Sequence, residues 1–340
     1  MKENIKDLNI SELEEIFESI NEKKYRAKQV FKWLYRDIKS FEQMSDISIE
    51  LRNKLDEKFD ICIYKILKKQ VSKDGTIKYL FELSKDDNAI ETVFMKYKFG
   101  NSICVSTQIG CKMGCRFCAS TGISFVRDLT SGEIIEQILS VIRDTKEKIS
   151  NIVFMGIGEP LDNYDNVVKA IQLINAPNGL NISVRHISIS TCGLVNNIYK
   201  LADQNISSTL SISLHASTNE KRSKIMPIND KYDIQEILKA CKYYIEKTNR
   251  RITFEYALIK DNNDSIEDAN ALAKLLKGIL CHINLIPINK IDNGEYNKTS
   301  DDKILKFRDY LNEKGITATV RRELGSDIEA ACGQLRRQKR

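Results

Sequence analysis

The chain has 340 residues, of which 42% are hydrophobic and 29% are charged. That length suggests one large domain, or a large domain with a small one, and allows a full core without disulfides. Only 15 glycines and 4 prolines are present, which excludes collagen-like and low-complexity chains. No apolar run approaches the roughly 18 residues of a membrane span, and the N-terminal segment is acidic where a signal peptide is apolar. We therefore expect a cytoplasmic protein with no membrane segment.

The charge balance permits nucleic-acid binding without requiring it. There are 53 basic and 47 acidic residues, a net charge of +6. The basic excess is most visible near the C-terminus, at Arg321, Arg322 and residues 336–340. Such a cluster is either a solvated tail or a set of phosphate contacts, and the sequence leaves both readings open.

Residues 1–70 have the apolar spacing of short amphipathic helices. We expect helices at 11–20, capped by Ser11, at 26–38 and at 49–59. Basic residues alternate with aromatic residues around the second helix, and the aromatic residues are expected in a small helical core. The basic side chains that could then face RNA are Lys23, Lys24, Arg26, Lys28 and Lys32. We predict that residues 1–70 form an accessory RNA-binding domain.

The pattern changes to strands near residue 71. Asp74-Gly75 separates two alternating segments, which predicts a β-hairpin within an extension covering 71–102. Strands then alternate with helices through 103–320, and Thr130 with Glu133 forms a capping box. The expected strands are 103–108, 151–156, 184–191, 208–214, 251–259 and 281–288. Six such units predict an α/β fold with a parallel sheet, a partial (β/α)6 barrel, followed by a C-terminal loop and tail at 321–340.

Nine cysteines in a large chain argue against a disulfide framework. Cys62, Cys192, Cys241 and Cys281 lie in apolar or periodic segments and are predicted to be small core residues. Three other cysteines, Cys111, Cys115 and Cys118, form a C-x3-C-x2-C sequence after the first barrel strand. Cysteine is the usual ligand of iron–sulfur clusters, whereas a structural zinc site needs four ligands. Three thiolates would leave one iron of a 4Fe-4S cluster open to a substrate or cofactor.

Polar residues follow the other predicted strands, where barrel enzymes place their active sites. The second strand ends at Gly158-Glu159-Pro160, whose glycine lets the backbone approach a ligand while Glu159 offers an acceptor for an amine. Taken singly, each polar residue could equally be an ordinary loop residue. The remaining candidates are Ser190, Ser213, Leu214, His215 and Asn289.

These motifs together resemble the RlmN family of the radical S-adenosylmethionine (SAM) superfamily. The resemblance runs from about residue 12 to 337 and includes the segments 104–110, 222–229, 254–256 and 327–335. It implies methylation of carbon 2 of an adenine in 23S rRNA and in tRNA. It also implies one 4Fe-4S cluster on Cys111, Cys115 and Cys118. SAM would be bound by Gly158, Glu159, Ser190, Ser213, Leu214, His215 and Asn289.

The same resemblance implies roles for three further residues. Cys332 would accept a methyl group from one SAM, and a second SAM would supply the radical that activates this methyl group for addition to adenine. Cys104 would then release the RNA by forming a transient disulfide with Cys332, and Glu91 would accept a proton near the adduct. We further expect an external electron donor, such as flavodoxin or ferredoxin, and a monomeric enzyme.

Two other functions remain open. The first is methylation of carbon 8 of the same rRNA adenine, which confers antibiotic resistance and uses the same cysteines. Pro160 and the Thr191-Cys192-Gly193 segment resemble the carbon-2 enzymes more. The second is a non-catalytic iron–sulfur or zinc protein that binds RNA as an assembly factor.

Overall fold

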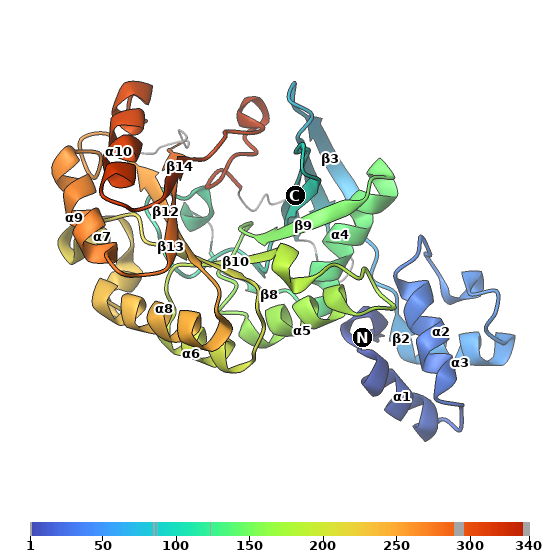
Figure 1. Cartoon of the computed structure of the whole chain (residues 1–340). Coiled ribbons are helices and arrows are strands. Elements are labelled where there is room, and N and C mark those ends of the chain that lie inside the picture. The colour runs from blue at the N-terminus through green and yellow to red at the C-terminus, as the bar shows by residue number, and fades with distance from the viewer. Residues whose placement is uncertain (1, 84–85, 87, 123, 289–295, 336–340) are drawn as a thin grey trace.

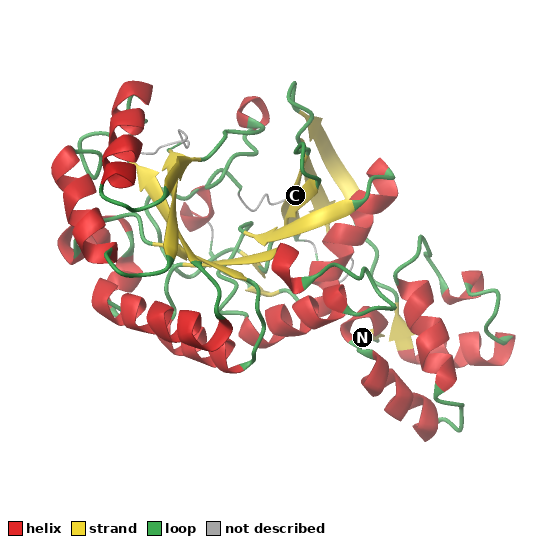
Figure 2. Ribbon diagram, in the orientation of Figure 1, coloured by secondary structure: helices red, strands yellow, loops and turns green. Residues whose placement is uncertain are grey.

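The fold is a ten-stranded mixed sheet flanked by helices, as a computed structural model of the chain shows (Figure 1). The structure describes residues 2–83, 86, 88–122, 124–288 and 296–335. Helices α4 to α10 lie along the outside of the curved sheet, and the three N-terminal helices stand at one end of the molecule (Figure 2). No helix in these ranges is long and apolar enough to span a lipid bilayer.

The elements have the following bounds. The ten strands of the large sheet are β3 (Lys65–Val71), β4 (Ile77–Glu82), β5 (Ala89–Met95), β6 (Asn101–Cys104), β9 (Ile149–Phe154), β10 (Ile187–Thr191), β11 (Thr209–Ser213), β12 (Ile252–Leu258), β13 (Cys281–Pro287) and β14 (Ala318–Val320). The short pairs are β1 (Glu3–Asn4) with β2 (Phe59–Asp60) and β7 (Gln108–Ile109) with β8 (Arg127–Asp128). The helices are α1 (Ile10–Ser19), α2 (Tyr25–Leu34), α3 (Ile49–Lys58), α4 (Ser131–Thr145), α5 (Tyr164–Asn175), α6 (Val195–Asp203), α7 (Asn219–Ile225), α8 (Ile234–Thr248), α9 (Ile266–Leu276) and α10 (Asp301–Glu313).

The sheet has a parallel part and an antiparallel part that meet at β6. From β6 through β9, β10, β11, β12 and β13 to β14, each strand pairs in parallel with the next. On the other side of β6, strands β5, β4 and β3 pair antiparallel. The predicted six-unit partial barrel is therefore confirmed. A seventh parallel strand, β14, extends it beyond the prediction.

The local signals explain most of these elements. The hairpin between β3 and β4 turns at Asp74-Gly75 as predicted, with Val71 opposite Ile77. The predicted capping box of Thr130 and Glu133 begins α4. The predicted cap at Ser11 is wrong, because Asn9 caps α1 through the backbone N–H of Glu12. Asparagine caps as well as serine does, and its position one residue before the first apolar residue decides between them.

A buried ion pair joins the N-terminal segment to the barrel. The Lys6 ammonium contacts the Glu136 carboxylate in α4, and both side chains are at most 1% exposed. Lys6 also donates to the Cys62 carbonyl at 2.8 Å, and Arg143 binds the same carboxylate. Such a pair fixes the junction strongly, because removing either partner leaves a buried charge uncompensated.

We predict that Glu136→Leu lowers the free energy of unfolding by about 3–5 kcal/mol, since it strands the buried Lys6 charge. Glu147→Leu is the matched control, because Glu147 pairs with Lys96 at the surface, where both side chains are more than 40% exposed. That loss should stay within about 1 kcal/mol. Urea denaturation followed by circular dichroism measures both values. Equal losses of unfolding free energy in the two variants would show that the buried Lys6–Glu136 pair matters no more than a surface pair.

Candidate active site

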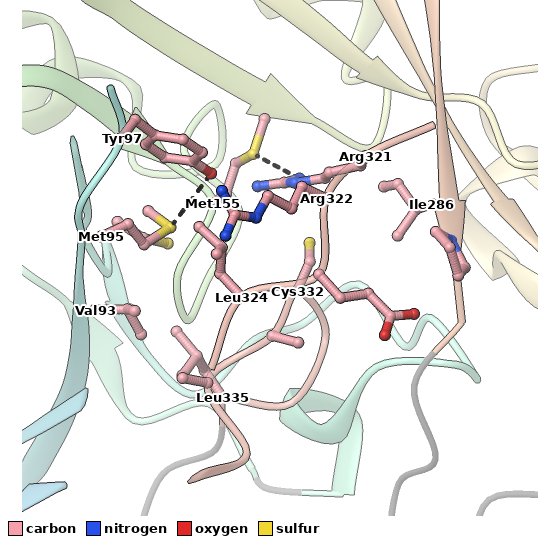
Figure 3. A pocket seen from close by; sticks show the side chains of 15 residues that line it. Val93, Met95, Tyr97, Met155, Ile286, Arg321, Arg322, Leu324, Cys332 and Leu335 are labelled. Atoms are coloured by element: carbon pink, nitrogen blue, oxygen red, sulfur yellow. Dashed lines mark hydrogen bonds between the residues drawn. The ribbon is translucent and has the colours of Figure 1, made fainter. Parts of the chain in front are cut away.

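Two adjoining cavities lie at the carboxyl ends of the parallel strands. The larger, of about 150 Å³, is lined by the three clustered cysteines and by the ends of β9, β10, β11 and β12. The smaller, of about 40 Å³, lies between β5, β6 and the C-terminal loop. Four residues line both cavities, namely Met155, Ile286, Arg321 and Cys332. The two cavities therefore share a wall, which Figure 3 shows from the side of the smaller one.

The larger cavity gathers most of the predicted site residues. Those on its wall are Cys111, Cys115, Cys118, Gly158, Glu159, Ser190, Ser213, His215 and Cys332. Leu214 does not line it, because its side chain is fully buried in the core. Asn289 lies outside the described residues. The agreement follows from topology, since parallel strands bring their carboxyl ends to the same edge of a sheet.

The three cysteines occupy a loop that is fastened to α7. The backbone N–H of Arg116 donates to the carbonyl of Ile225 at 2.9 Å, and that of Cys118 donates to the carbonyl of Cys115 at 3.1 Å. Burial raises the pKa of all three thiols, that of Cys111 to about 12. Thiols in this setting become thiolates only against a cation, and iron supplies one.

The donor set therefore fits an iron–sulfur cluster. In the ranges that the structure describes, no three His, Cys, Asp or Glu side chains are arranged to hold a single metal ion. An iron–sulfur cluster needs a wider spacing of its ligands, because each cysteine binds a different iron of the cluster. The thiols of Cys111, Cys115 and Cys118, which lie on one wall of the larger cavity, fit this arrangement.

Both carboxylate oxygens of Glu159 accept hydrogen bonds from the backbone. The backbone N–H groups of Leu161 and Cys192 donate to its two oxygens at 3.0 and 2.8 Å. Burial nevertheless raises the pKa of Glu159. Gly158 precedes it with φ +102°, and a Cβ there would lie 2.6 Å from the Gln108 side chain, so only glycine fits. A buried carboxylate in this setting attracts a ligand amine.

His215 is a neutral hydrogen-bond donor toward the cavity. Its Nδ1 accepts a hydrogen bond from the Ala257 backbone N–H at 2.9 Å, which places the ring proton on Nε2. Burial lowers the His215 pKa to about 3, with a smaller contribution from Arg222. The ring packs edge-on against Phe117 of the cysteine loop, with centroids 4.7 Å apart.

Arg222 holds the strand ends from behind the cavity, a role that sequence reasoning did not assign. Its side chain is fully buried. Its guanidinium donates to three backbone carbonyl oxygens at the ends of β10 and β11. The acceptors are Cys192 at 2.6 Å, Ser213 at 3.2 Å and Leu214 at 3.2 Å. These hydrogen bonds fix the wall of the larger cavity.

The C-terminal loop, residues 325–335, is clamped between the hairpin and the cysteine loop. On the hairpin side, Asp74 accepts from the Gly325 N–H at 2.9 Å, and Ser72 donates to Asp327 at 2.6 Å. On the opposite side, Ala119 N–H donates to the Gly333 carbonyl and Ser120 to the Leu335 carbonyl, both at 2.8 Å. This clamp places Cys332 in the wall shared by the two cavities.

Cys104 and Cys332 line the same small cavity. Cys104 ends β6 and is 8% exposed, among Val93, Met95 and Leu324. Burial, and to a smaller extent Cys332, raise its pKa to about 12, against the opposing effect of Arg321. Cys332 is exposed in its loop. The fold thus brings to one cavity two thiols that are 228 positions apart (332 − 104).

Glu91 lies beside this cavity and is paired with a lysine. It is buried on β5, and Lys78 of β4 approaches its carboxylate to 3.6 Å. Lys78 also donates to the backbone carbonyl of Glu329 at 3.1 Å. Glu91 lines neither cavity in this arrangement. Lys78 therefore connects Glu91 to the loop that carries Cys332.

The structure refines the sequence expectations for three residues. Cys192 is buried, but it also lines the larger cavity, so it is more than a core residue. Cys281 is only partly buried. Arg321 is not part of a solvated tail, because it lines both cavities, whereas Arg322 is exposed. Residues 336–340 lie outside the described ranges.

Comparison with known proteins agrees with this geometry. A model of the radical SAM superfamily matches residues 105–273, and one described as "Ribosomal RNA large subunit methyltransferase N-terminal domain" matches residues 3–61. A solved radical SAM methyltransferase from Sphaerobacter thermophilus superposes with a TM-score of 0.93 at 39% identity, covering 98% of this chain and 99% of that one. The chain has the fold of a radical SAM methyltransferase, a class that uses SAM and a 4Fe-4S cluster.

Curated relatives define the family more narrowly. A protein named "Probable dual-specificity RNA methyltransferase RlmN" from Clostridium botulinum (strain Alaska E43 / Type E3) is 56% identical and covers 98% of this chain and 96% of its own length. One of the same name from Clostridium novyi (strain NT) is 55% identical, with 98% of both chains covered. The chain belongs to the RlmN family of radical SAM RNA methyltransferases, and its substrates are RNA.

We predict that Cys115→Ala abolishes cluster binding, because two thiolates cannot enclose the cluster on this wall. After anaerobic reconstitution, iron and sulfide content and the visible absorption band should fall to background. Cys241→Ala is the matched control, since Cys241 is fully buried in α8 and does not line either cavity. It should keep a full cluster. Full iron content in Cys115→Ala would refute the ligand assignment.

We predict that the loop clamp weakens at low pH. Burial opposes ionisation of Asp74, but hydrogen bonds from Gly325, Thr76 and Ser72 outweigh it and lower its pKa from 3.8 to about 2. A lowered folded-state pKa stabilises the clamp above pH 3.8, and this contribution is lost as the pH falls toward 2. Hydrogen-exchange protection of residues 325–335 should fall across that range.

Asp74→Ala should lower the same protection already at neutral pH. The further loss on acidification should be smaller than in the unaltered chain, because Asp327, whose pKa is also lowered by hydrogen bonds from Ser72 and Lys73, is then the remaining carboxylate of the clamp. Asp309→Ala is the control, because Asp309 is exposed on α10 and pairs with Arg308. It should leave the loop as protected as in the unaltered chain. Equal protection in Asp74→Ala and the unaltered chain would show that the clamp does not depend on Asp74.

Proposed function

We propose that this protein methylates carbon 2 of an adenine in 23S rRNA, at the peptidyl-transferase centre, and in the anticodon loop of tRNA. One observation carries the proposal: Cys332 lies in the wall between a cavity lined by three clustered cysteines and a cavity lined by Cys104. A methyl carrier that must meet a cofactor on one side and a resolving thiol on the other needs that position.

The proposed chemistry follows from the electron-poor character of carbon 2, which is not a nucleophile. A cluster bound by Cys111, Cys115 and Cys118 would reduce SAM and so supply a 5′-deoxyadenosyl radical, with two SAM consumed per turnover. Glu159, Ser190, Ser213 and His215 would orient SAM in the larger cavity, together with Gly158.

The two remaining cysteines would carry the methyl carbon and release the product. Cys332 would hold the methyl group as a thioether, and the 5′-deoxyadenosyl radical would take one hydrogen atom from it. The methylene carbon would then bond to adenine and leave the RNA attached to the protein, and this radical adduct would give up one electron to the cluster and one proton. The Cys104 sulfur would bond to the Cys332 sulfur and break the link to the RNA. Glu91 would take the proton that leaves the adenine, after the C-terminal loop frees it from Lys78.

The remaining assignments complete the proposal. Residues 1–70 would bind RNA as an accessory domain, next to the extension 71–102, the barrel 103–320 and the catalytic loop and tail 321–340. An external donor such as flavodoxin or ferredoxin would supply electrons, and the enzyme would work as a monomer. The target adenine must leave its stack to reach the cavity, so a loop or an unfolded RNA intermediate is the substrate.

Mass spectrometry of modified rRNA and tRNA tests the proposal directly. We expect 2-methyladenosine in RNA treated with the holoenzyme and SAM. Finding 8-methyladenosine would support the carbon-8 alternative instead. An assembly factor without catalytic activity would yield neither product and no 5′-deoxyadenosine.

We predict that Cys104→Ala traps the enzyme on its substrate, whereas Cys332→Ala forms no adduct. The thioether bond between Cys332 and adenine is stable unless a second thiolate attacks the Cys332 sulfur. Purified Cys104→Ala protein should carry RNA that survives denaturation, and peptide mass spectrometry should place the remnant on Cys332. Normal turnover of Cys104→Ala, or a remnant on another residue, would contradict the two-cysteine reaction.

We predict that three lysines at the start of α2, namely Lys23 and Lys24 just before it and Lys28 within it, contribute phosphate contacts. Lys23, Lys24 and Lys28 are exposed, and their conversion to Gln should weaken RNA binding and flatten its salt dependence by about one unit of slope per lost contact. Formation of 5′-deoxyadenosine without RNA should be unchanged. The control changes three exposed lysines of α8, Lys239, Lys242 and Lys247, to Gln. If both triple variants show the same salt dependence of RNA binding, Lys23, Lys24 and Lys28 make no phosphate contacts.

A further inference from the structure

Arg321 lies at the junction of the two cavities. It follows β14, and its backbone N–H donates to the Leu285 carbonyl at 2.8 Å, which extends the pairing of β14 with β13. Its guanidinium reaches 3.6 Å from the Met155 sulfur and 3.9 Å from the Glu255 carboxylate. Figure 3 shows Arg321 and Cys332 reaching into the same space. The seventh strand thus delivers a cation to the wall that the cavities share.

Cys104 needs such a cation. It is packed among apolar side chains, and burial, reinforced by Cys332, raises its pKa to about 12. The thiolate is the form that attacks sulfur, and near neutral pH a thiol in this setting is almost wholly protonated. A Cys332 sulfur that is bonded to carbon cannot ionise, so it cannot repel the Cys104 thiolate. What remains is the favourable charge of Arg321, which lines the same cavity as Cys104.

We propose that Arg321 stabilises the Cys104 thiolate while it attacks Cys332 and releases the RNA. This inference rests on the proposed two-cysteine reaction and adds a residue to its last step. In that step the bond between the Cys104 and Cys332 sulfurs forms, and the bond from the Cys332 sulfur to the methylene carbon breaks. The electron pair stays on that carbon, is delocalised into the adenine ring, and takes up a proton to complete the methyl group. The two sulfurs are oxidised by two electrons, the carbon is reduced, and a dithiol reductant reopens the disulfide.

The other charged groups near Cys104 are less suited to this role. Those that line the small cavity, besides the two thiols and Arg321, are Tyr97, Arg322 and Glu323. Arg322 and Glu323 are exposed, so water screens their charges. Lys78 and Glu91 pair with each other on the neighbouring strands. Glu255, which also accepts from Asn284 at 2.8 Å, anchors Arg321 from the side of β12.

The test compares Arg321→Met with Arg321→Lys, and with Arg322→Met as the matched control from the same cavity. Holoprotein is mixed with RNA and SAM in a single turnover, and the covalent protein–RNA species is followed on denaturing gels and mapped by mass spectrometry. Arg321→Met should form the adduct on Cys332 but resolve it about tenfold more slowly or worse near neutral pH, since each unit of added Cys104 pKa removes tenfold of the thiolate. Raising the pH by about two units should restore much of the rate, because it restores the thiolate.

Arg321→Lys should recover part of the rate, because it keeps the charge, and Arg322→Met should resolve its adduct at the rate of the unaltered chain. Resolution of the Arg321→Met adduct at the normal rate would overturn the proposal. A slow rate that does not respond to pH would also overturn it, because that result indicates a structural role. Absence of any adduct in Arg321→Met would overturn it by placing Arg321 in an earlier step.

The Cys104→Ala variant separates this inference from the proposed function. If Cys104→Ala accumulates no adduct, the two-cysteine reaction itself fails. If Cys104→Ala traps RNA while Arg321→Met does not, the reaction stands and only the role of Arg321 fails. Iron content and SAM cleavage without RNA, measured on every variant, confirm that each protein is folded and loaded.

Discussion

The hydrogen bonds that hold the C-terminal loop across the strand ends are the interaction on which the site depends. A disulfide forms only between cysteines whose Cα atoms come within about 4.4–6.8 Å. Cys104 ends a strand near the start of the barrel, and Cys332 lies close to the end of the chain. Asp74 and Ser72 hold the loop at Gly325 and Asp327, and the cysteine loop holds it at Gly333 and Leu335. These two attachments, with the hydrogen bond from Lys78 to the Glu329 carbonyl, keep Cys332 between the two cavities.

The antiparallel part of the sheet holds the C-terminal loop, and the parallel part forms the cavity around the three cysteines. The antiparallel strands β3 to β5 provide the hairpin that clamps the loop, and they place Lys78 beside Glu91. The parallel strands bring their carboxyl ends together around the three cysteines, and Arg222 fixes those ends through backbone carbonyl oxygens. β6 belongs to both parts, and it ends at Cys104. The hairpin extension is therefore as much a part of the site as the barrel.

The clamp also explains why a loop, rather than a strand end, carries Cys332. A residue that takes a methyl group on one side and meets RNA and a second thiol on the other must move between partners. Residues 325–335 are held by a few hydrogen bonds, one of them exposed, and by the buried side chains of Ala330, Ala331 and Leu335. Gly325 adopts φ +65°, where a Cβ would lie 2.7 Å from Ala330. Such contacts are individually weak. They define a resting position without preventing the loop from opening.

The sequence predicts those features that depend on local pattern. Alternating apolar residues gave the six strands, the Asp74-Gly75 turn gave the hairpin, and cysteine spacing gave the cluster loop. It could not predict β14, because three residues at the end of the chain carry too little pattern. Arg321 resembled its exposed neighbour Arg322, and Cys192 resembled any buried cysteine. Their roles depend on which strands lie next to one another, and local composition does not contain that information.

The central claim is that the protein's own Cys332 delivers the methyl carbon to RNA, and an isotope experiment tests it most directly. Protein isolated with an unlabelled methyl group on Cys332 is mixed with excess RNA and SAM whose methyl group is fully deuterated. The account predicts that the first methyl group on each RNA product comes from the protein and contains no deuterium from the SAM methyl group. A first product that already carries a deuterated methyl group would show direct transfer from SAM and would contradict the account.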